Sequence, residues 1–244
     1  MAAAWIVPDW PAPEGVGAVV ATRHGPGVSA GAYARFNLGL RSGDAIDAVV
    51  ANRAALLPAL GLPEAPLWLR QVHGVDVAEG PMPDGDEPAA DAAIARGPGR
   101  VLAILTADCL PVLFTSGDGG SIGAAHAGWR GLAAGVLENT MAAMGAEGVL
   151  AWLGPAIGAE SYEVGEEVRA AFVDTDQSAE AAFTPTRPGH WLCDLYALAR
   201  RRLAAAGVAS VSGGGFDTFR DDRLYSYRRD GAASGRFATL IWTR

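Results

Sequence analysis

The sequence contains no lysine, so all 19 of its basic residues are arginine. A chain without lysine cannot form a Schiff base with a substrate or with pyridoxal phosphate. It also lacks the lysine of the phosphate-binding loop, and no motif of that type is present. These chemistries are excluded. Any anion that the protein binds has to be met by arginine side chains or backbone amides.

Cysteine and histidine are also scarce, with two cysteines, Cys109 and Cys193, and four histidines in the chain. Two cysteines form no disulfide framework. Four imidazoles are too few for the several copper sites that reduce dioxygen in multicopper oxidases, although a Cys and two His can hold one copper. The net charge of -8 argues against nucleic acid or an anionic membrane as the main partner.

Long hydrophobic runs and a targeting signal are missing as well. The apolar N-terminal run ends at Pro8 and has no basic residues before it, which is a poor match to a signal peptide. The longest apolar stretch, 101–115, is interrupted by Asp108 and Pro111 and does not suit a bilayer span. The sequence therefore predicts a cytoplasmic protein.

What the chain does have is hydrophobic residues, which make up 50% of its 244 positions and suffice for a sizeable core. We expect a single domain over residues 1–244. Strands and helices mix without a steady βαβ rhythm, which favours an α+β fold with mixed sheets. Expected strands are 15–21, 68–77, 101–105, 112–115, 121–125, 149–154, 208–211 and 237–242; expected helices are 44–57 (capped by Asp44), 131–144, 163–172 and 194–206. Loops are expected at 23–29 and 81–88, and a hairpin turn at 228–231.

Three segments combine an apolar strand with a residue that binds metals. They end in His73, Cys109 and His126. Two imidazoles and a thiolate suit zinc and leave a fourth position open, where the metal lowers the pKa of a water to roughly 7. Their spacing matches no short zinc-finger signature, so the pattern alone also fits a buried cysteine and two hydrogen-bonded core histidines.

Other charged residues near these segments have two interpretations each. Asp108 precedes the cysteine and is either a partner of the site that carries protons or an ordinary turn aspartate. Arg228 and Arg229 form either an anion site or a solvated turn with an internal ion pair. The arginines that qualify for a phosphate site are Arg23, Arg53, Arg228 and Arg229.

The motifs of this chain resemble those of the laccase-domain family, also called YfiH-like or multicopper polyphenol oxidase-like. The resemblance rests on segments 37–39, 71–74, 107–111, 125–131, 153–158, 162–168 and 225–231. They follow the family's order, and the similarity runs from about residue 18 to Trp242.

The resemblance implies a four-layer α/β/β/α sandwich and a single metal ion bound by His73, Cys109 and His126. Zinc is the expected ion and Cu²⁺ the second choice. Family activities imply phosphorolysis of adenosine, inosine and methylthioadenosine, and deamination of adenosine, with a nucleoside and phosphate as partners. We assign catalysis to Cys109, His126 and Asp108, and substrate binding to Asn37, Arg23, Arg228 and Arg229.

Three alternatives stay open. One is a Cys–His hydrolase in peptidoglycan editing, with Cys109 as nucleophile and His126 as its base. The second is a copper-dependent polyphenol oxidase, which the small number of histidines disfavours. The third is a metal-binding partner protein without enzymatic activity. The chain also departs from the family at Asp217–Thr218, where members often have Cys-Thr, so no thiol can act at that position.

Overall fold

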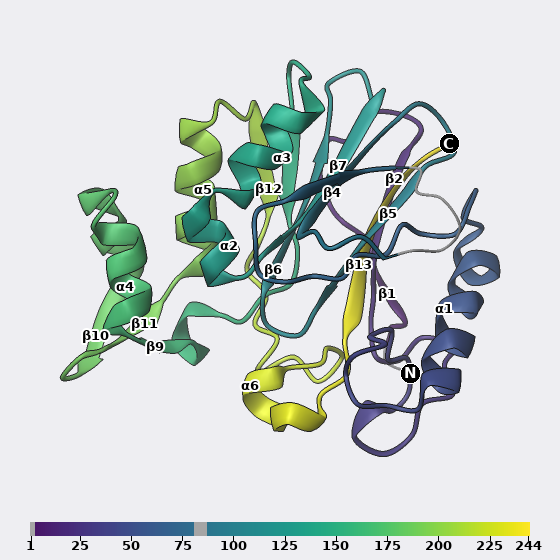
Figure 1. Cartoon of the computed structure of the whole chain (residues 1–244), viewed down its shortest axis with the longest axis horizontal. Helices are drawn as coiled ribbons and strands as arrows, with labels where there is room; N and C mark the ends of the chain where they lie inside the picture. Colours follow the sequence, from purple (N-terminus) through teal and green to yellow (C-terminus); the bar gives the residue numbers. More distant parts are fainter. Residues whose placement is uncertain (1–2, 81–86) are drawn as a thin grey trace.

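The computed structural model describes residues 3–80 and 87–244. Two β-sheets lie face to face, and helices cover the outer face of each (Figure 1). The four-stranded sheet is antiparallel throughout. Its order is β1 (Trp5–Ile6), β2 (Val16–Ala21), β13 (Phe237–Thr243) and β5 (Val101–Thr106).

The second sheet has six strands. Its order is β12 (Ser210–Gly213), β8 (Leu150–Leu153), β6 (Leu110–Thr115), β7 (Ser121–Ala127), β4 (Ala92–Arg96) and β3 (Val77–Glu79). β12 pairs with β8, and β3 with β4, in parallel, whereas the other pairs are antiparallel. Strands β6 and β7 are buried along their whole length. This explains why they are almost continuous apolar runs rather than alternating ones.

Side chains of the four-stranded sheet alternate between two cores, as the pleat requires. Leu102 and Ile104 face the core between the two sheets, together with Ile122 of the six-stranded sheet. Val101 and Ala103 face the opposite side, where Leu56 of α1 (Ile46–Leu60) packs. The helix α1 therefore forms one outer layer of the molecule.

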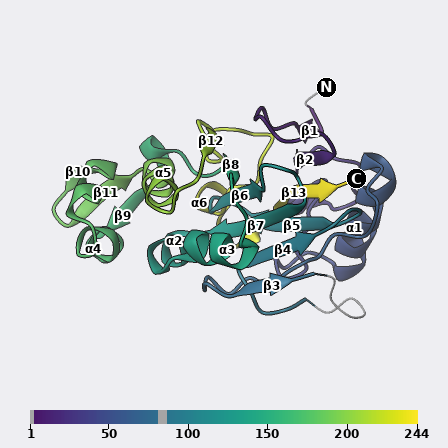
Figure 2. The same ribbon diagram turned by 90° about the horizontal axis from the view of Figure 1, so that it is seen from above.

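The other outer layer consists of α2 (Trp129–Ala134), α3 (Val136–Met144) and α5 (Leu195–Ala205), which pack on the six-stranded sheet. A small third sheet lies at the end of the molecule away from α1 (Figure 2). Its strands are β10 (Phe183–Arg187), β11 (His190–Cys193) and β9 (Glu163–Gly165), and α4 (Glu166–Val173) lies beside it. The short helices are α6 (Tyr227–Asp230) and the 3₁₀ turns Gly31–Tyr33, Ala159–Ser161, Gln177–Ala182 and Gly231–Ala233. The predicted α+β fold with four α/β/β/α layers is confirmed.

The expected strand 68–77 is wrong for most of its length. Isolated bridges occur at Leu67 and Arg70, and β3 begins only at Val77. The backbone between them turns, because His73 has a φ of 62° and the amides of residues 72–74 bind a carboxylate instead of a neighbouring strand. The apolar pattern of the segment predicted a strand because it does not show that the Asp91 carboxylate binds these amides.

Other expected elements are shifted or divided. The helix 131–144 is two helices, because Gly135 has a φ of 103° and ends α2. Residues 163–165, expected as helix, form β9 and pair with β11. The expected hairpin turn at 228–231 is the helix α6, whose first turn is capped by the Ser226 hydroxyl.

Asp44 does not cap α1 as predicted. The helix begins after Ala45, and the Asp44 carboxylate accepts hydrogen bonds from Ser29 and Asn37 instead. Most of the loop expected at 81–88 lies outside the described residues. Among the residues that are described, every helix is too short or too polar to cross a lipid bilayer.

We expect Ile104→Ala to lower the free energy of unfolding by about 2–5 kcal/mol, because Ile104 is fully buried between the sheets and its loss leaves a cavity. Urea denaturation measures the change. Ile46→Ala is the matched control, since Ile46 is 65% exposed and should change stability by no more than about 0.5 kcal/mol. Equal effects of the two substitutions would contradict the stacking of the sheets.

Candidate metal site and its cavity

His73, Cys109 and His126 come together from three different places in the fold. His73 lies in the turn before β3, Cys109 in the turn between β5 and β6, and His126 within β7. One nitrogen or sulfur atom from each lies within 4.8 Å of the others. The two imidazole rings meet edge to face, with their centroids 4.9 Å apart. The structure therefore brings the three sequence-predicted residues together.

The carboxylate of Asp91 holds two of these residues in place. It is fully buried just before β4. One oxygen accepts hydrogen bonds from His126 Nδ1 at 2.7 Å and from the His73 amide at 2.9 Å. The other accepts from the amides of Val72 and Gly74 at 3.0 and 2.7 Å. These bonds leave Nε2 of His126 directed at the cluster, which is how carboxylates orient metal-binding histidines.

The sequence analysis did not identify Asp91, which stands between two pairs of alanines. A lone aspartate next to an Ala-rich strand is the only local signal. Its partners are mostly backbone amides, which no residue pattern displays. Because a buried carboxylate needs several donors, its location in an otherwise apolar segment was the available sign of a buried network.

Without a metal, the surroundings of the cluster favour a thiolate next to an imidazolium. Burial disfavours the thiolate, but the rings of His126 and His73 outweigh burial and lower the pKa of Cys109 to about 6. Burial also opposes the charge on His126, but Cys109 and Asp91 raise its pKa to about 9. A thiol that ionises this readily is ready to bind a metal or to act as a nucleophile.

Asp108 lies beside the cysteine but faces a different set of groups. One of its carboxylate oxygens accepts a hydrogen bond from the Thr218 hydroxyl at 2.6 Å, and the other from the Arg228 amide at 2.7 Å. These bonds tie the cysteine turn to the segment that carries α6. A proton-carrying role for Asp108 stays a prediction, since its hydrogen-bond partners, Thr218 and Arg228, lie outside the cluster.

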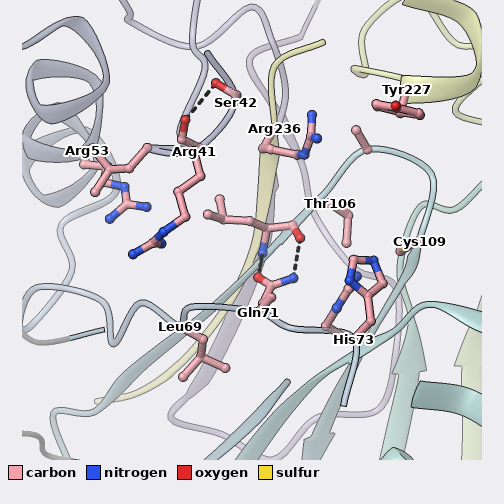
Figure 3. Close-up of a pocket in the computed structure, with 15 residues that line it drawn as sticks. Arg41, Ser42, Arg53, Leu69, Gln71, His73, Thr106, Cys109, Tyr227 and Arg236 are labelled. Atoms are coloured by element: carbon pink, nitrogen blue, oxygen red, sulfur yellow. Dashed lines mark hydrogen bonds between the residues drawn. The ribbon is translucent and has the colours of Figure 1, made fainter. Parts of the chain in front are cut away.

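A cavity of about 360 Å³ opens from the cluster (Figure 3). This is within the usual range for small-molecule sites. His73 and Cys109 lie at one end, and Arg41 and Arg53 at the other. The complete lining is Gly39, Leu40, Arg41, Ser42, Arg53, Leu69, Gln71, His73, Leu105, Thr106, Ala107, Cys109, His126, Tyr227 and Arg236. The amide of Gln71 forms part of the wall, because both its oxygen and its nitrogen pair with the backbone of Leu105.

The four residues assigned to substrate binding from the sequence are not among the residues that line this cavity. Arg23 donates to the carbonyl of Ala34, and Arg228 to that of Glu163. Arg229 donates to several backbone carbonyls and to Asp230. Asn37 is fully buried and forms hydrogen bonds with Ser42 and Gly39, which line the cavity. These side chains shape the fold around the site, and their direct contact with a substrate stays a prediction.

Of the arginines considered from the sequence, Arg53 does reach the cavity. It stacks on the ring of Trp68 at 4.1 Å and donates to Glu87 at 2.6 Å. Arg41 forms an ion pair with the same carboxylate. Glu87 therefore neutralises part of the positive charge at this end of the cavity.

Asp217, which stands where the family often has cysteine, ties two loops together. Its carboxylate accepts hydrogen bonds from the Gly158 amide at 3.0 Å and the Ser161 hydroxyl at 2.6 Å. Its role in the described structure is to hold the loop after β8 against the segment before α6.

Comparisons with known proteins identify the family of this chain. The family model of the multi-copper polyphenol oxidoreductase laccase matches residues 17–244. A curated relative from Xylella fastidiosa named purine nucleoside phosphorylase is 54% identical, over 98% of this chain and 96% of its own. Purine nucleoside phosphorylase YfiH of Escherichia coli is 49% identical, over 97% of this chain and 98% of its own.

Solved structures are similar as well. A Neisseria meningitidis protein superposes with a TM-score of 0.94 at 45% identity and covers 99% of both chains. YlmD from Geobacillus stearothermophilus gives a TM-score of 0.90 at 31% identity, over 100% of this chain and 97% of its own. The chain belongs to the multi-copper polyphenol oxidoreductase laccase family, whose model matches residues 17–244.

Proposed function

We propose that this protein is a purine nucleoside enzyme with one metal site, which cleaves nucleosides with phosphate and deaminates adenosine. The observation that carries the proposal is the cluster of His73, Cys109 and His126 at the end of a nucleoside-sized cavity. The names of the relatives support the phosphorolysis. Among the described residues, this is the one group of three or more potential ligands, which favours a single ion over several coppers.

The three side chains suit zinc. Two imidazoles and a thiolate form a donor set of the type found in catalytic zinc sites, with a fourth position left for water or substrate. An ion held by them would supply Lewis-acid activation of that water or of a substrate oxygen. Asp91 contributes by fixing the tautomer and orientation of His126, and Cys109 is disposed to bind as thiolate.

In phosphorolysis, an oxygen of hydrogen phosphate forms a bond to C1′ of the ribose while the bond from C1′ to the purine nitrogen breaks. The electron pair of that bond leaves with the purine, which receives the proton of the hydrogen phosphate. The cavity residues bind and orient the two reactants. The ring of Tyr227, which is 53% exposed and lines the cavity, offers an aromatic face for the base. Deamination adds water at C6 and releases ammonia, so it needs no anion site.

A Cys–His hydrolase is the second candidate. The specific observation in its favour is that His126 lies between Cys109 and Asp91, as the base does in a nucleophile–base–carboxylate triad. In that case the protein needs no metal, and alkylation of Cys109 stops its activity.

We expect the purified protein to hold one metal ion per chain, and Cys109→Ala to lose both that ion and turnover. The reason is that Cys109 supplies the only sulfur of the cluster. Elemental analysis and thermal melting give the readouts, and the fold should persist because the flanking strands are deeply buried. Cys193→Ala, at the buried cysteine outside the cluster, is the control and should keep the ion. Global unfolding of Cys109→Ala would make the site structural instead.

Asp91→Asn should weaken metal affinity by about 10- to 100-fold, because an amide is a poorer acceptor for the His126 ring and the three loop amides. Competition with a chromogenic chelator measures the affinity. Asp118→Asn is a suitable control, since this exposed carboxylate also accepts two hydrogen bonds but lies outside the cluster. An unchanged affinity in Asp91→Asn would rule out the orienting role.

Adenosine should yield adenine only when phosphate is present. It should yield inosine even when phosphate is absent. Phosphorolysis consumes phosphate, whereas deamination uses water alone. Chromatography of reactions with and without phosphate distinguishes the products. Release of adenine at the same rate in both would instead indicate hydrolysis and favour the Cys–His candidate.

A further inference from the structure

Arg236 lines the same cavity as the cluster, directly before β13. Figure 3 shows it between the arginine end of the cavity and Cys109. Its backbone is fixed on both sides: its amide donates to the side-chain oxygen of Asn37 at 2.8 Å, and its carbonyl accepts from the Leu38 amide at 3.0 Å. The arginine therefore has a defined position next to the candidate metal site.

Its side chain passes closely over Gly39. A Cβ atom at Gly39 would stand 2.7 Å from Cγ of Arg236, which is closer than side-chain carbons approach. The same Asn37 oxygen that holds Arg236 also accepts from the Gly39 amide at 3.1 Å. The Asn37–Gly39 segment thus forms a cradle for Arg236. Contact with Arg236 therefore explains why asparagine and glycine stand at positions 37 and 39, a motif to which the proposed function assigns no role.

The charge of Arg236 is not balanced by a carboxylate. One of its nitrogens donates to the carbonyls of Ser234 and Gly235, at 2.6 and 2.9 Å. Within residues 3–80 and 87–244 no Asp or Glu oxygen forms an ion pair with it, in contrast to Arg41 and Arg53, which share Glu87.

Burial lowers the pKa of Arg236 by disfavouring its charged form, and the negative charges of Cys109 and Asp108 counteract this only in part. The oxygens of Asp108 are already bonded to Thr218 and to the Arg228 amide. A partly buried guanidinium that faces a cavity without a carboxylate partner is a strong site for an oxyanion, because the anion replaces the water that the cation has lost.

We infer that Arg236 is the residue that binds inorganic phosphate in this cavity, and that Asn37 and Gly39 position it. The inference rests on the proposed function for the identity of the anion. It assigns the anion site to a residue that lines the same cavity as the cluster. The arginines of the α6 segment, which the sequence favoured, do not line this cavity, and Arg229 donates to several backbone carbonyls and to Asp230.

The test is the binding of inorganic phosphate to the purified protein without nucleoside, measured by calorimetry and by ³¹P line broadening. Arg236→Gln should weaken phosphate binding by at least about tenfold, as expected when a hydrogen bond to a charged group is lost. Metal content and melting temperature should stay unchanged. Arg236→Lys keeps the charge but loses the planar fork, so it should bind phosphate better than Arg236→Gln and less well than the natural protein.

Arg200→Gln is the matched control. Its guanidinium also donates to two backbone carbonyls, those of Val211 and Gly213, but lies outside the cavity. It should leave phosphate binding unchanged. Gly39→Ala tests the cradle, because it displaces Arg236 without removing its charge, and it should weaken phosphate binding while metal content is retained.

The outcomes separate this inference from the proposed function. If adenosine cleavage requires phosphate but Arg236→Gln has the same affinity and KM for phosphate as the natural protein, the inference is overturned and the function stands. If phosphate binds and Arg236→Gln abolishes the binding, while adenosine is not cleaved, the inference stands and the function fails. Absence of phosphate binding in the natural protein overturns the inference.

Discussion

The hydrogen bonds of one buried carboxylate, Asp91, determine the arrangement of the candidate site. An ionised carboxylate is stable in the interior only when its oxygens are met by several donors. Here the donors are three consecutive amides and the ring of His126. The same charge therefore shapes the turn that carries one histidine and orients the other.

The central strands of the fold could be predicted because burial on both faces of a strand produces a short, nearly continuous run of apolar residues. β5, β6 and β7 are examples, and His126 and Cys109 were predicted from their place at or near the ends of such runs. The turn around His73 could not be predicted, because its conformation depends on Asp91, a residue distant in sequence. The small sheet was equally hidden, since β9 exists only through its pairing with β11.

The arginines show a second limit of sequence reasoning. Residue type reveals a capacity to bind anions, but not whether the donors are already used. Arg228 and Arg229 lie in a motif that the sequence singled out, yet Arg228 donates to the carbonyl of Glu163 in β9, and Arg229 donates to carbonyls of the segment before α6. Arg236 had no motif of its own to single it out. Its importance follows from Asn37 and Gly39, nearly the whole chain away, and from a cavity that appears only when the two sheets are stacked.

The cavity lies at the seam between the two sheets, and each sheet contributes a different part of it. His73 and His126 belong to the six-stranded sheet and the turn before β3, whereas Arg41, Arg53 and Arg236 come from the four-stranded sheet and the α1 layer. The hydrogen bonds of Asp91 stay within the first group, and those of Asn37 within the second. Substitutions among the arginines can therefore change one end of the cavity without disturbing the hydrogen bonds that hold His73 and His126. A fold divided in this way keeps the packing of the cluster independent of the packing that sets the charge of the cavity.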